Sequence, residues 1–100
     1  MPEVARVGDA VSTGHGCVAT TTLDTPSQSS VFANGILICR VGDPTVAHPF
    51  PPDPPCADHI AQINAGSSSV FVAGVAVGRK GDSADADEIT EGSPTVFAGG

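Results

Sequence analysis

The apolar residues of this chain occur in short runs separated by glycine, proline and polar residues, and one such pattern occurs twice. Residues 30–43 read SVFANGILICRVGD and residues 69–82 read SVFVAGVAVGRKGD, at a constant offset of 39 residues. Each copy has an apolar run, a turn that contains glycine, a second apolar run and then Arg-x-Gly-Asp. Glycine allows the positive φ of a tight turn, and aspartate is a favoured turn residue. The pattern predicts a short-stranded β-hairpin in each copy.

Half-copies of the same unit lie at the two ends of the chain. Residues 4–9 (VARVGD) match the second half of the unit, and residues 93–100 (SPTVFAGG) match the first half. The halves complete each other if the two ends of the chain pair. We therefore expect a third hairpin built from both termini, and three hairpins related by a pseudo-threefold axis in a single closed domain, residues 1–100.

Three connections of unequal length join the predicted hairpins, at residues 10–29, 44–68 and 83–92. The middle connection is rich in proline, which predicts an extended arm with a helical turn, if any, at residues 58–63. The third connection predicts a solvated acidic loop. Its acids are Asp82, Asp85, Asp87, Glu88 and Glu91.

Composition supports a small, mostly β domain with a thin core. The chain has 12 Gly and 9 Pro, which leave little room for long helices. It has no Trp or Tyr and only 4 Phe, so most of its apolar residues are small. A domain with so little core volume is expected to need a further constraint, such as a bound metal or a partner.

Charge and cysteine content narrow the partners and the compartment. The net charge is −7 with only 4 basic residues, scattered along the chain, which makes nucleic acid and anionic membranes poor partners. The chain opens with Met-Pro-Glu and has no apolar run of membrane-spanning length, so we expect no cleaved signal peptide and a cytoplasmic location. The 3 cysteines are an odd number, which favours free thiols or thiolate ligands in a reducing compartment over a disulfide framework.

Several histidine and cysteine side chains could bind a metal ion. Cys56 and His59 have the C-x-x-H spacing that lets two donors of one turn face a common ion. His15 and His48 follow the first two Gly-Asp pairs at similar distances, so threefold symmetry would bring them together, while Asp87 and Glu88 occupy the third equivalent place. We therefore predict a tetrahedral metal site. Its ligands are His15, His48, Cys56 and His59.

Other residues of these motifs have simpler interpretations. Cys17 lies two residues from His15 and is the alternative metal ligand. Cys39 continues an apolar run and is expected to be a small buried side chain. The arginine and aspartate of each Arg-x-Gly-Asp are expected to pair across their turns or between units. The repeated phenylalanines are expected to form a threefold core layer: Phe32, Phe71 and Phe97.

Together these features resemble the PAAR-repeat family over essentially the whole chain. The similarity rests on the repeated Val-Phe hairpins that end in Arg-x-Gly-Asp, on Gly14-His15-Gly16, His48 and Cys56-x-x-His59, and on residues 92–97. The Pro-Ala-Ala-Arg tetrapeptide of the family is replaced here by Leu37-Ile-Cys-Arg40 and Ala76-Val-Gly-Arg79. The resemblance implies a conical, mostly β domain whose apex is fixed by a zinc ion, with the same four residues as ligands.

The resemblance also implies a structural role rather than an enzymatic one. Such domains cap the blunt end of a trimeric β-helical spike in type VI secretion systems and related phage-tail-like contractile machines, one cap per trimer, and sharpen it for crossing a membrane. The expected location is the cytoplasm before assembly and then the tip of the machine, in transient contact with the target membrane.

Two other functions fit the same residues. The domain could act chiefly as an adaptor that tethers a separate effector to the spike. It could also be a small zinc hydrolase with Asp53 or Asp58 as the general base, although a catalytic zinc usually keeps an open position and this chain offers four donors. The sequence does not distinguish a phage tail from a secretion system or identify the spike.

Overall fold

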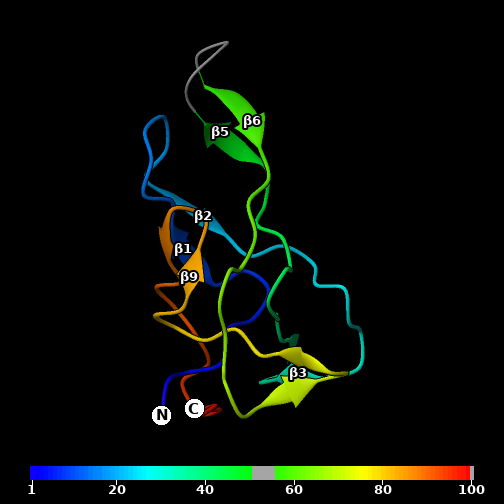
Figure 1. The fold of residues 1–100 in the computed structure, drawn as a ribbon. Coiled ribbons are helices and arrows are strands. Elements are labelled where there is room, and N and C mark those ends of the chain that lie inside the picture. Colours follow the sequence, from blue (N-terminus) through cyan, green and yellow to red (C-terminus); the bar gives the residue numbers. More distant parts are fainter. Residues whose placement is uncertain (51–55, 100) are drawn as a thin grey trace.

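The computed structural model describes residues 1–50 and 56–99, and the regular elements in these residues are all β-strands. The strands are β1 (Ala10–Ser12), β2 (Thr20–Thr22), β3 (Phe32–Ala33), β4 (Ile36–Leu37), β5 (His48–Phe50), β6 (Ala57–His59), β7 (Phe71–Val72), β8 (Val75–Ala76), β9 (Ser83–Ala84) and β10 (Asp87–Glu88). They pair as antiparallel two-stranded ribbons, β1 with β2, β3 with β4, and so on along the chain (Figure 1).

The prediction of a small, mostly β fold is thus confirmed for the described part of the chain. No helix that could cross a membrane is found there. The helical turn expected at residues 58–63 is wrong, because residues 57–59 pair with residues 48–50 as strand β6. The prolines at positions 51, 52, 54 and 55 lie outside the described residues.

Two of the hairpins form where the repeats predict them, at β3–β4 and β7–β8. Their two-residue turns are Asn34-Gly35, with φ of 57° and 75°, and Ala73-Gly74, with φ of 50° and 81°. Positive φ at both turn positions gives the type I′ turn, whose twist matches that of short antiparallel strands.

The third hairpin joins the two ends of the chain. Glu3 pairs with Phe97, and the Val4 amide donates to the Val96 carbonyl at 3.0 Å. The same bond closes the intact units, where the amides of residues 38 and 77 donate to the carbonyls of residues 31 and 70 at 3.1 Å. The predicted pairing of the termini is therefore present in the structure.

A cyclic set of backbone hydrogen bonds connects the three units. The Ala5 amide donates to the Gly78 carbonyl, the Gly78 amide donates to the Cys39 carbonyl, and the Cys39 amide donates to the Ala5 carbonyl. Each of these bonds measures 2.9 Å. These three hydrogen bonds form a closed ring, the central ring, of the kind that a threefold axis produces. A second set of bridges repeats the cycle and consists of Val11 with Ile89, Leu23 with Thr45, and Ile63 with Ala84.

The core lies along this axis and consists of small side chains. One cluster of buried residues comprises Ala5, Val11, Leu23, Cys39, Ile63, Ala84 and Ile89, and a second comprises Val4, Ala33, Ile38, Val77 and Ala98. The burial predicted for Cys39 is confirmed, since it is fully buried.

Each unit also carries the ion pair that the Arg-x-Gly-Asp motif predicts. Arg6 pairs with Asp9 at 3.2 Å, and the pairs at residues 40 and 43 and at residues 79 and 82 measure 3.8 and 2.9 Å. The hydrogen bond to the aspartate raises the pKa of the Arg6 and Arg79 guanidinium groups. Each ion pair joins the two ends of the turn that follows a residue of the central ring.

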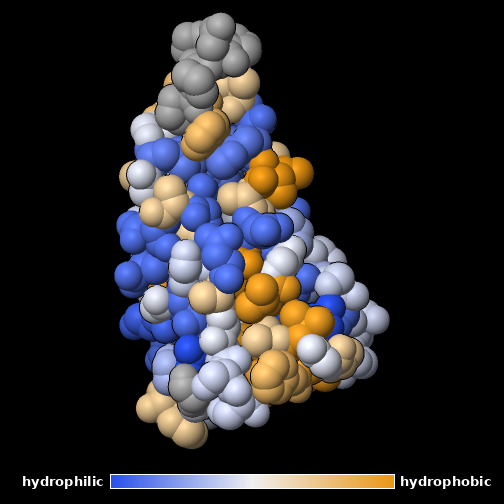
Figure 2. All heavy atoms as spheres, in the orientation of Figure 1, coloured by the Kyte–Doolittle hydropathy of each residue, from blue (hydrophilic) through white to orange (hydrophobic). Residues whose placement is uncertain are grey.

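The molecule is elongated, with extents of 39 × 23 × 21 Å, and Figure 2 shows it narrowing from the β3 end towards the β5–β6 end. At the wide end the expectation of a buried phenylalanine layer is wrong. Phe32, Phe71 and Phe97 are 54%, 55% and 45% exposed. Phe32 and Phe71 lie on the first strand of their hairpins, and Phe97 has the equivalent position opposite Glu3. Alanine, valine and isoleucine side chains form the buried cluster instead.

Candidate metal centre

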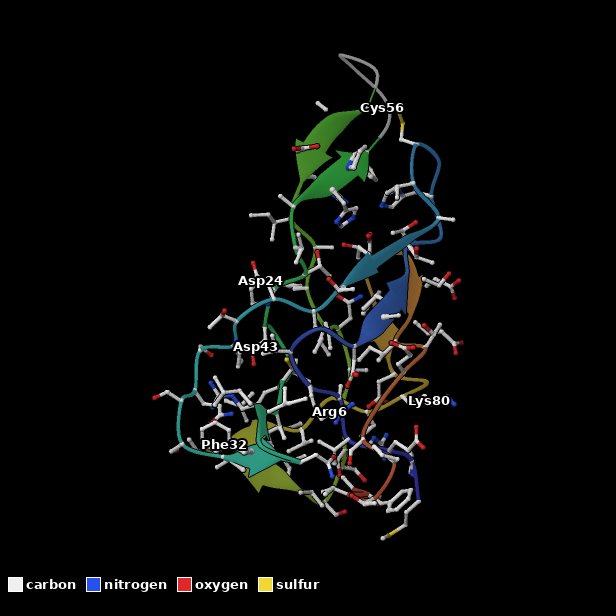
Figure 3. All side chains as sticks on the ribbon, turned by 180° about the vertical axis from the view of Figure 1, so that it is seen from behind. Arg6, Asp24, Phe32, Asp43, Cys56 and Lys80 are labelled. Atoms are coloured by element: carbon white, nitrogen blue, oxygen red, sulfur yellow. A yellow bond between two sulfur atoms is a disulfide. The ribbon has the colours of Figure 1, made fainter. Side chains whose placement is uncertain are left out.

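Three further ribbons, β1–β2, β5–β6 and β9–β10, bring ionisable side chains together towards the narrow end. His15 lies in the loop between β1 and β2, and Asp85 lies in the turn between β9 and β10. His48 begins β5 and His59 ends β6, and the two are direct partners in the antiparallel register. Figure 3 shows this end from behind, with Cys56 near the tip and Phe32 at the opposite end. The three connections that join the hairpins of the wide end thus all contribute to one cluster.

The donor atoms of this cluster face one another. The Nε2 atom of His59 lies 2.7 Å from Nε2 of His48 and 3.2 Å from Nε2 of His15, and the latter two lie 3.3 Å apart. Oδ2 of Asp85 lies 2.9 Å from Nε2 of His15, 2.8 Å from that of His48 and 3.6 Å from that of His59. Ligands of a tetrahedral zinc ion, at about 2.0–2.1 Å from the metal, are about 3.3 Å apart. The cluster therefore has the dimensions of a four-ligand site.

Backbone carbonyls set the tautomer of two of the histidines. Nδ1 of His15 lies 2.9 Å from the Gly16 carbonyl, and Nδ1 of His48 lies 2.8 Å from the Val46 carbonyl. A carbonyl only accepts hydrogen bonds, so each Nδ1 carries the proton and donates it. The Nε2 lone pair of each ring is then directed at the cluster, which is the arrangement found in metal-binding histidines.

The cluster is largely shielded from water. The side chains of His15, His48 and Asp85 are 8%, 4% and 5% exposed, and that of His59 is 28% exposed. Phe50 stacks on the His59 ring at 4.2 Å and meets the His15 ring edge-on at 4.7 Å. Lone pairs and a carboxylate held this close, away from water, repel one another unless a cation or a proton lies between them.

The close approach of two loops brings Asp85 and His15 together. The Ala86 amide donates to the Thr13 carbonyl at 3.1 Å. At Gly14, whose φ is +71°, a Cβ atom would lie 2.7 Å from the Ala86 carbonyl oxygen, so a side chain there would force the loops apart. Asn64 holds the other side of the turn by donating to the Asp85 carbonyl at 3.0 Å. Glycine is therefore required by packing at position 14, whereas a side chain at position 16 would meet open space.

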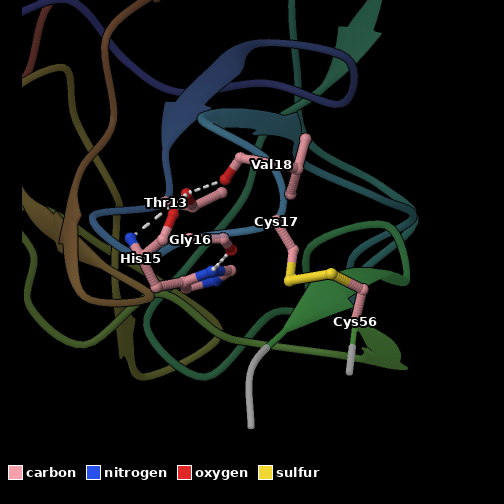
Figure 4. Close-up of a disulfide and its surroundings, with 6 residues drawn as sticks. All are labelled: Thr13, His15, Gly16, Cys17, Val18 and Cys56. Carbon is pink, nitrogen blue, oxygen red and sulfur yellow. Dashed lines mark hydrogen bonds between the residues drawn. A yellow bond between two sulfur atoms is a disulfide. The ribbon is translucent and has the colours of Figure 1, made fainter. Parts of the chain in front are cut away.

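The structure brings together the three predicted histidines, but it places the cysteines differently. Cys56 is bonded to Cys17 in a disulfide with Cα atoms 5.5 Å apart (Figure 4). The expectation of free thiols at these positions is wrong, because the loop and the hairpin approach within the range that a disulfide spans. In this structure the sulfurs of Cys56 and of the alternative ligand Cys17 are bonded to each other, so neither is a thiolate donor. Of the two suggested general bases, Asp58 is exposed on β6 and Asp53 lies outside the described residues.

Asp85 is the donor that sequence reasoning missed. The acidic connection was expected to be a solvated loop, whereas residues 83–88 form the hairpin β9–β10 and turn this carboxylate inward. A signal existed, since Asp85 follows the third Gly-Asp just as the histidines follow the first two. However, Asp85 lies nearer to its Gly-Asp than the two histidines lie to theirs, and the residues at the matching distance are Asp87 and Glu88. Both of those side chains are exposed.

No protein-family model matches this chain, and no curated protein matches it. The structure shows an all-β fold in the described residues and a cluster that could hold a metal ion. The cluster consists of His15, His48, His59 and Asp85.

Proposed function

We propose that this protein is a metal-fixed tip of the PAAR type, which docks by its wide end on the blunt end of a trimeric β-helical spike. The machine would be a type VI secretion system or a related phage-tail-like contractile injector. The observation that carries the proposal is the cyclic pairing of Ala5, Cys39 and Gly78, which gives one chain an internal threefold arrangement. A chain of this kind can present three similar surfaces to three identical subunits.

The wide end has the chemistry of a docking surface. Each unit exposes a phenylalanine preceded by a half-exposed valine, so the same apolar pair occurs around the axis. The pairs are Val31 with Phe32, Val70 with Phe71, and Val96 with Phe97. Figure 2 shows apolar side chains gathered over this end. Repeated apolar groups on a small soluble domain are typical of a surface that a partner covers.

The narrow end supports the piercing role in the proposal. We assign zinc to the cluster because imidazole and carboxylate ligands suit this ion and the donor spacing matches a tetrahedral set. His15, His48 and His59 would bind through Nε2 and Asp85 through Oδ2. A closed four-ligand site contributes folding free energy, and here it would fasten three loops that have little apolar core between them. The ion is thus assigned a structural role.

In this proposal the chain is made in the cytoplasm and reaches the target membrane only as part of the assembled machine. Docking rests on apolar contact and on backbone pairing at strand ends rather than on charge, since the cap has few basic residues and a net charge of −7. We therefore expect salt to weaken docking only modestly.

The test is the mass of the complex with a spike. The purified chain is mixed with a trimeric β-helical spike protein from the same genome, and the complex is analysed by light scattering. We expect one chain per spike trimer. A ratio of three chains per trimer, or no complex with any such spike, would contradict the proposal.

Matched variants show which end docks. Replacing Phe32, Phe71 and Phe97 with serine should abolish docking and leave metal binding intact. Phe32 lies at the opposite end of the molecule from Cys56 (Figure 3), and the other two phenylalanines occupy the equivalent position in their own hairpins. His15→Ala should weaken metal binding and retain docking. If instead the histidine variant lost docking while the phenylalanine variant kept it, the narrow end would be the interface.

A further inference from the structure

We propose that the Cys17–Cys56 disulfide is a redox-controlled clasp, which slows the release of the metal ion while it is closed and speeds it when it is reduced. The inference rests on the metal centre of the proposed function. It concerns the two cysteines, which are exposed and lie beside the ligands without belonging to the donor cluster.

The bridge joins two segments that carry different ligands. Cys17 lies two residues after His15 in the β1–β2 loop, and Cys56 lies three residues before His59 on the β5–β6 hairpin. In the part of the chain that the structure describes, no backbone hydrogen bond links residues 13–19 to β5 or β6. Apart from the disulfide, the contacts between these described segments are those of the His15 ring with the rings of the hairpin. The disulfide is therefore the covalent link across the metal centre.

The backbone conformation at both cysteines also favours separation of the two segments once the disulfide is reduced. The φ angles are 75° at Cys17 and 63° at Cys56, in the left-handed region that side-chain-bearing residues rarely adopt. Such conformations persist only where the surrounding structure enforces them. With the bridge cut, each backbone can return to an ordinary conformation, and the loop that carries His15 moves away from the hairpin that carries His59.

The chemistry of opening is a thiol–disulfide exchange. A dithiol gives two electrons to the bridge, its own sulfurs become a disulfide, and Cys17 and Cys56 each gain a proton as thiols. A low-molecular-weight disulfide reverses the reaction. Both cysteines are exposed and open to such reagents, whereas Cys39 is fully buried in the core. Exchange is thus confined to the bridge beside the metal centre.

Opening should raise the rate of metal release. In the closed form the two ligand-bearing segments are already held together, so the ion does not have to order them. In the open form the ion has to order both segments, and this loss of backbone freedom opposes binding. We expect release from the reduced protein to be about 10- to 100-fold faster, which corresponds to about 1.4–2.8 kcal/mol.

The experiment uses the full chain loaded with zinc. One sample is kept oxidised, and a second is treated with a dithiol and desalted without oxygen. A third is the Cys17→Ser/Cys56→Ser double variant, and Cys39→Ala is the matched control. Zinc release to a chromophoric chelator is followed over time, and cobalt-substituted samples are examined for the absorption band of a metal-bound thiolate.

Fast release from both the reduced protein and the double variant, with no thiolate band and with Cys39→Ala behaving as wild type, is the expected result. Equal release rates before and after reduction would overturn the clasp and leave the metal centre standing. Slower release after reduction, with a thiolate band, would show that a cysteine joins the metal and would also overturn it. An oxidised protein that binds no zinc would overturn the metal centre itself, and the clasp with it.

Discussion

At the scale of single residues, the surroundings decide what a carboxylate does in this protein. Asp85 has a side chain that is 5% exposed and lies against the three histidines. Asp87, two residues further on, is exposed and accepts a hydrogen bond from the Ser12 hydroxyl at 2.7 Å. Two acids of one hairpin thus have different roles, and the difference can be tested.

Asp85→Asn should weaken zinc binding by about tenfold or more, because an amide oxygen carries no negative charge and is a poorer ligand for the ion. Asp87→Asn is the matched control and should bind zinc as the unmodified chain does. Competition with a chromophoric chelator measures both affinities. Equal affinities in the two variants would remove Asp85 from the site.

Cys39 gives a prediction for alkaline pH. Burial raises the pKa of the Cys39 thiol from its ordinary value of 9.0 to about 12. Between these values the unfolded chain loses a proton that the folded chain keeps, so stability should fall as the pH rises from 9 towards 12. The fall should be up to about 4 kcal/mol.

Cys39→Ala removes this titration at the cost of a small core truncation of about 1–2 kcal/mol. Denaturant unfolding of both proteins between pH 8 and 12 tests the prediction. The stability difference between them should shrink or reverse as the pH rises. A difference that stays constant over this range would show that Cys39 does not titrate as its burial requires.

At the scale of elements, the hairpins are similar in backbone and unequal in turn chemistry. The β3–β4 turn has asparagine at its first position, a residue that tolerates positive φ, and its side chain donates to the Thr95 hydroxyl at 2.7 Å. The β7–β8 turn has Ala73 at the equivalent position with a φ of 50°. Alanine in the left-handed region costs about 1 kcal/mol or more.

Ala73→Gly should therefore stabilise the protein by about 1 kcal/mol, which raises Tm by about 4–8 °C for a domain of this size. Asn34→Gly is the comparison and should not stabilise it, because it removes side-chain hydrogen bonds. Thermal unfolding followed by circular dichroism measures both. A lower Tm for Ala73→Gly would mean that the turn does not have the strain that its φ indicates.

At the scale of the whole molecule, the fold is closed by pairing of its own ends. Because the same backbone hydrogen bond closes each of the three hairpins, we expect that it does not matter which hairpin is left open. A circular permutant in which a short linker joins residue 100 to residue 1, and the chain is opened between Asn34 and Gly35, should fold with a similar circular dichroism spectrum. Opening the chain between Cys39 and Arg40 interrupts the central ring and should prevent folding. If the two permutants behaved alike, the ring would not be what holds the units together.

The hairpins and the pairing of the ends could be predicted, because the repeat occurs in full at residues 30–43 and 69–82 and as two halves at the ends of the chain. The sequence predicted three of the four clustered donors. For Asp85 the repeat gave only an approximate signal, because the three connections have unequal lengths and the spacing after Gly-Asp differs among them. For the disulfide the repeat gave no signal. The exposure of the phenylalanines could not be predicted either, since a repeated position indicates equivalent surroundings and not burial.

In the proposed function, one zinc ion joins three connections of the chain at its narrow end. Elemental analysis of the oxidised protein, purified without chelator, measures how much metal each chain contains. We predict about one zinc ion per chain, lost when His48 is replaced with alanine. Protein that folds and contains no metal, or a His48→Ala variant that keeps its zinc, would contradict the proposed metal centre.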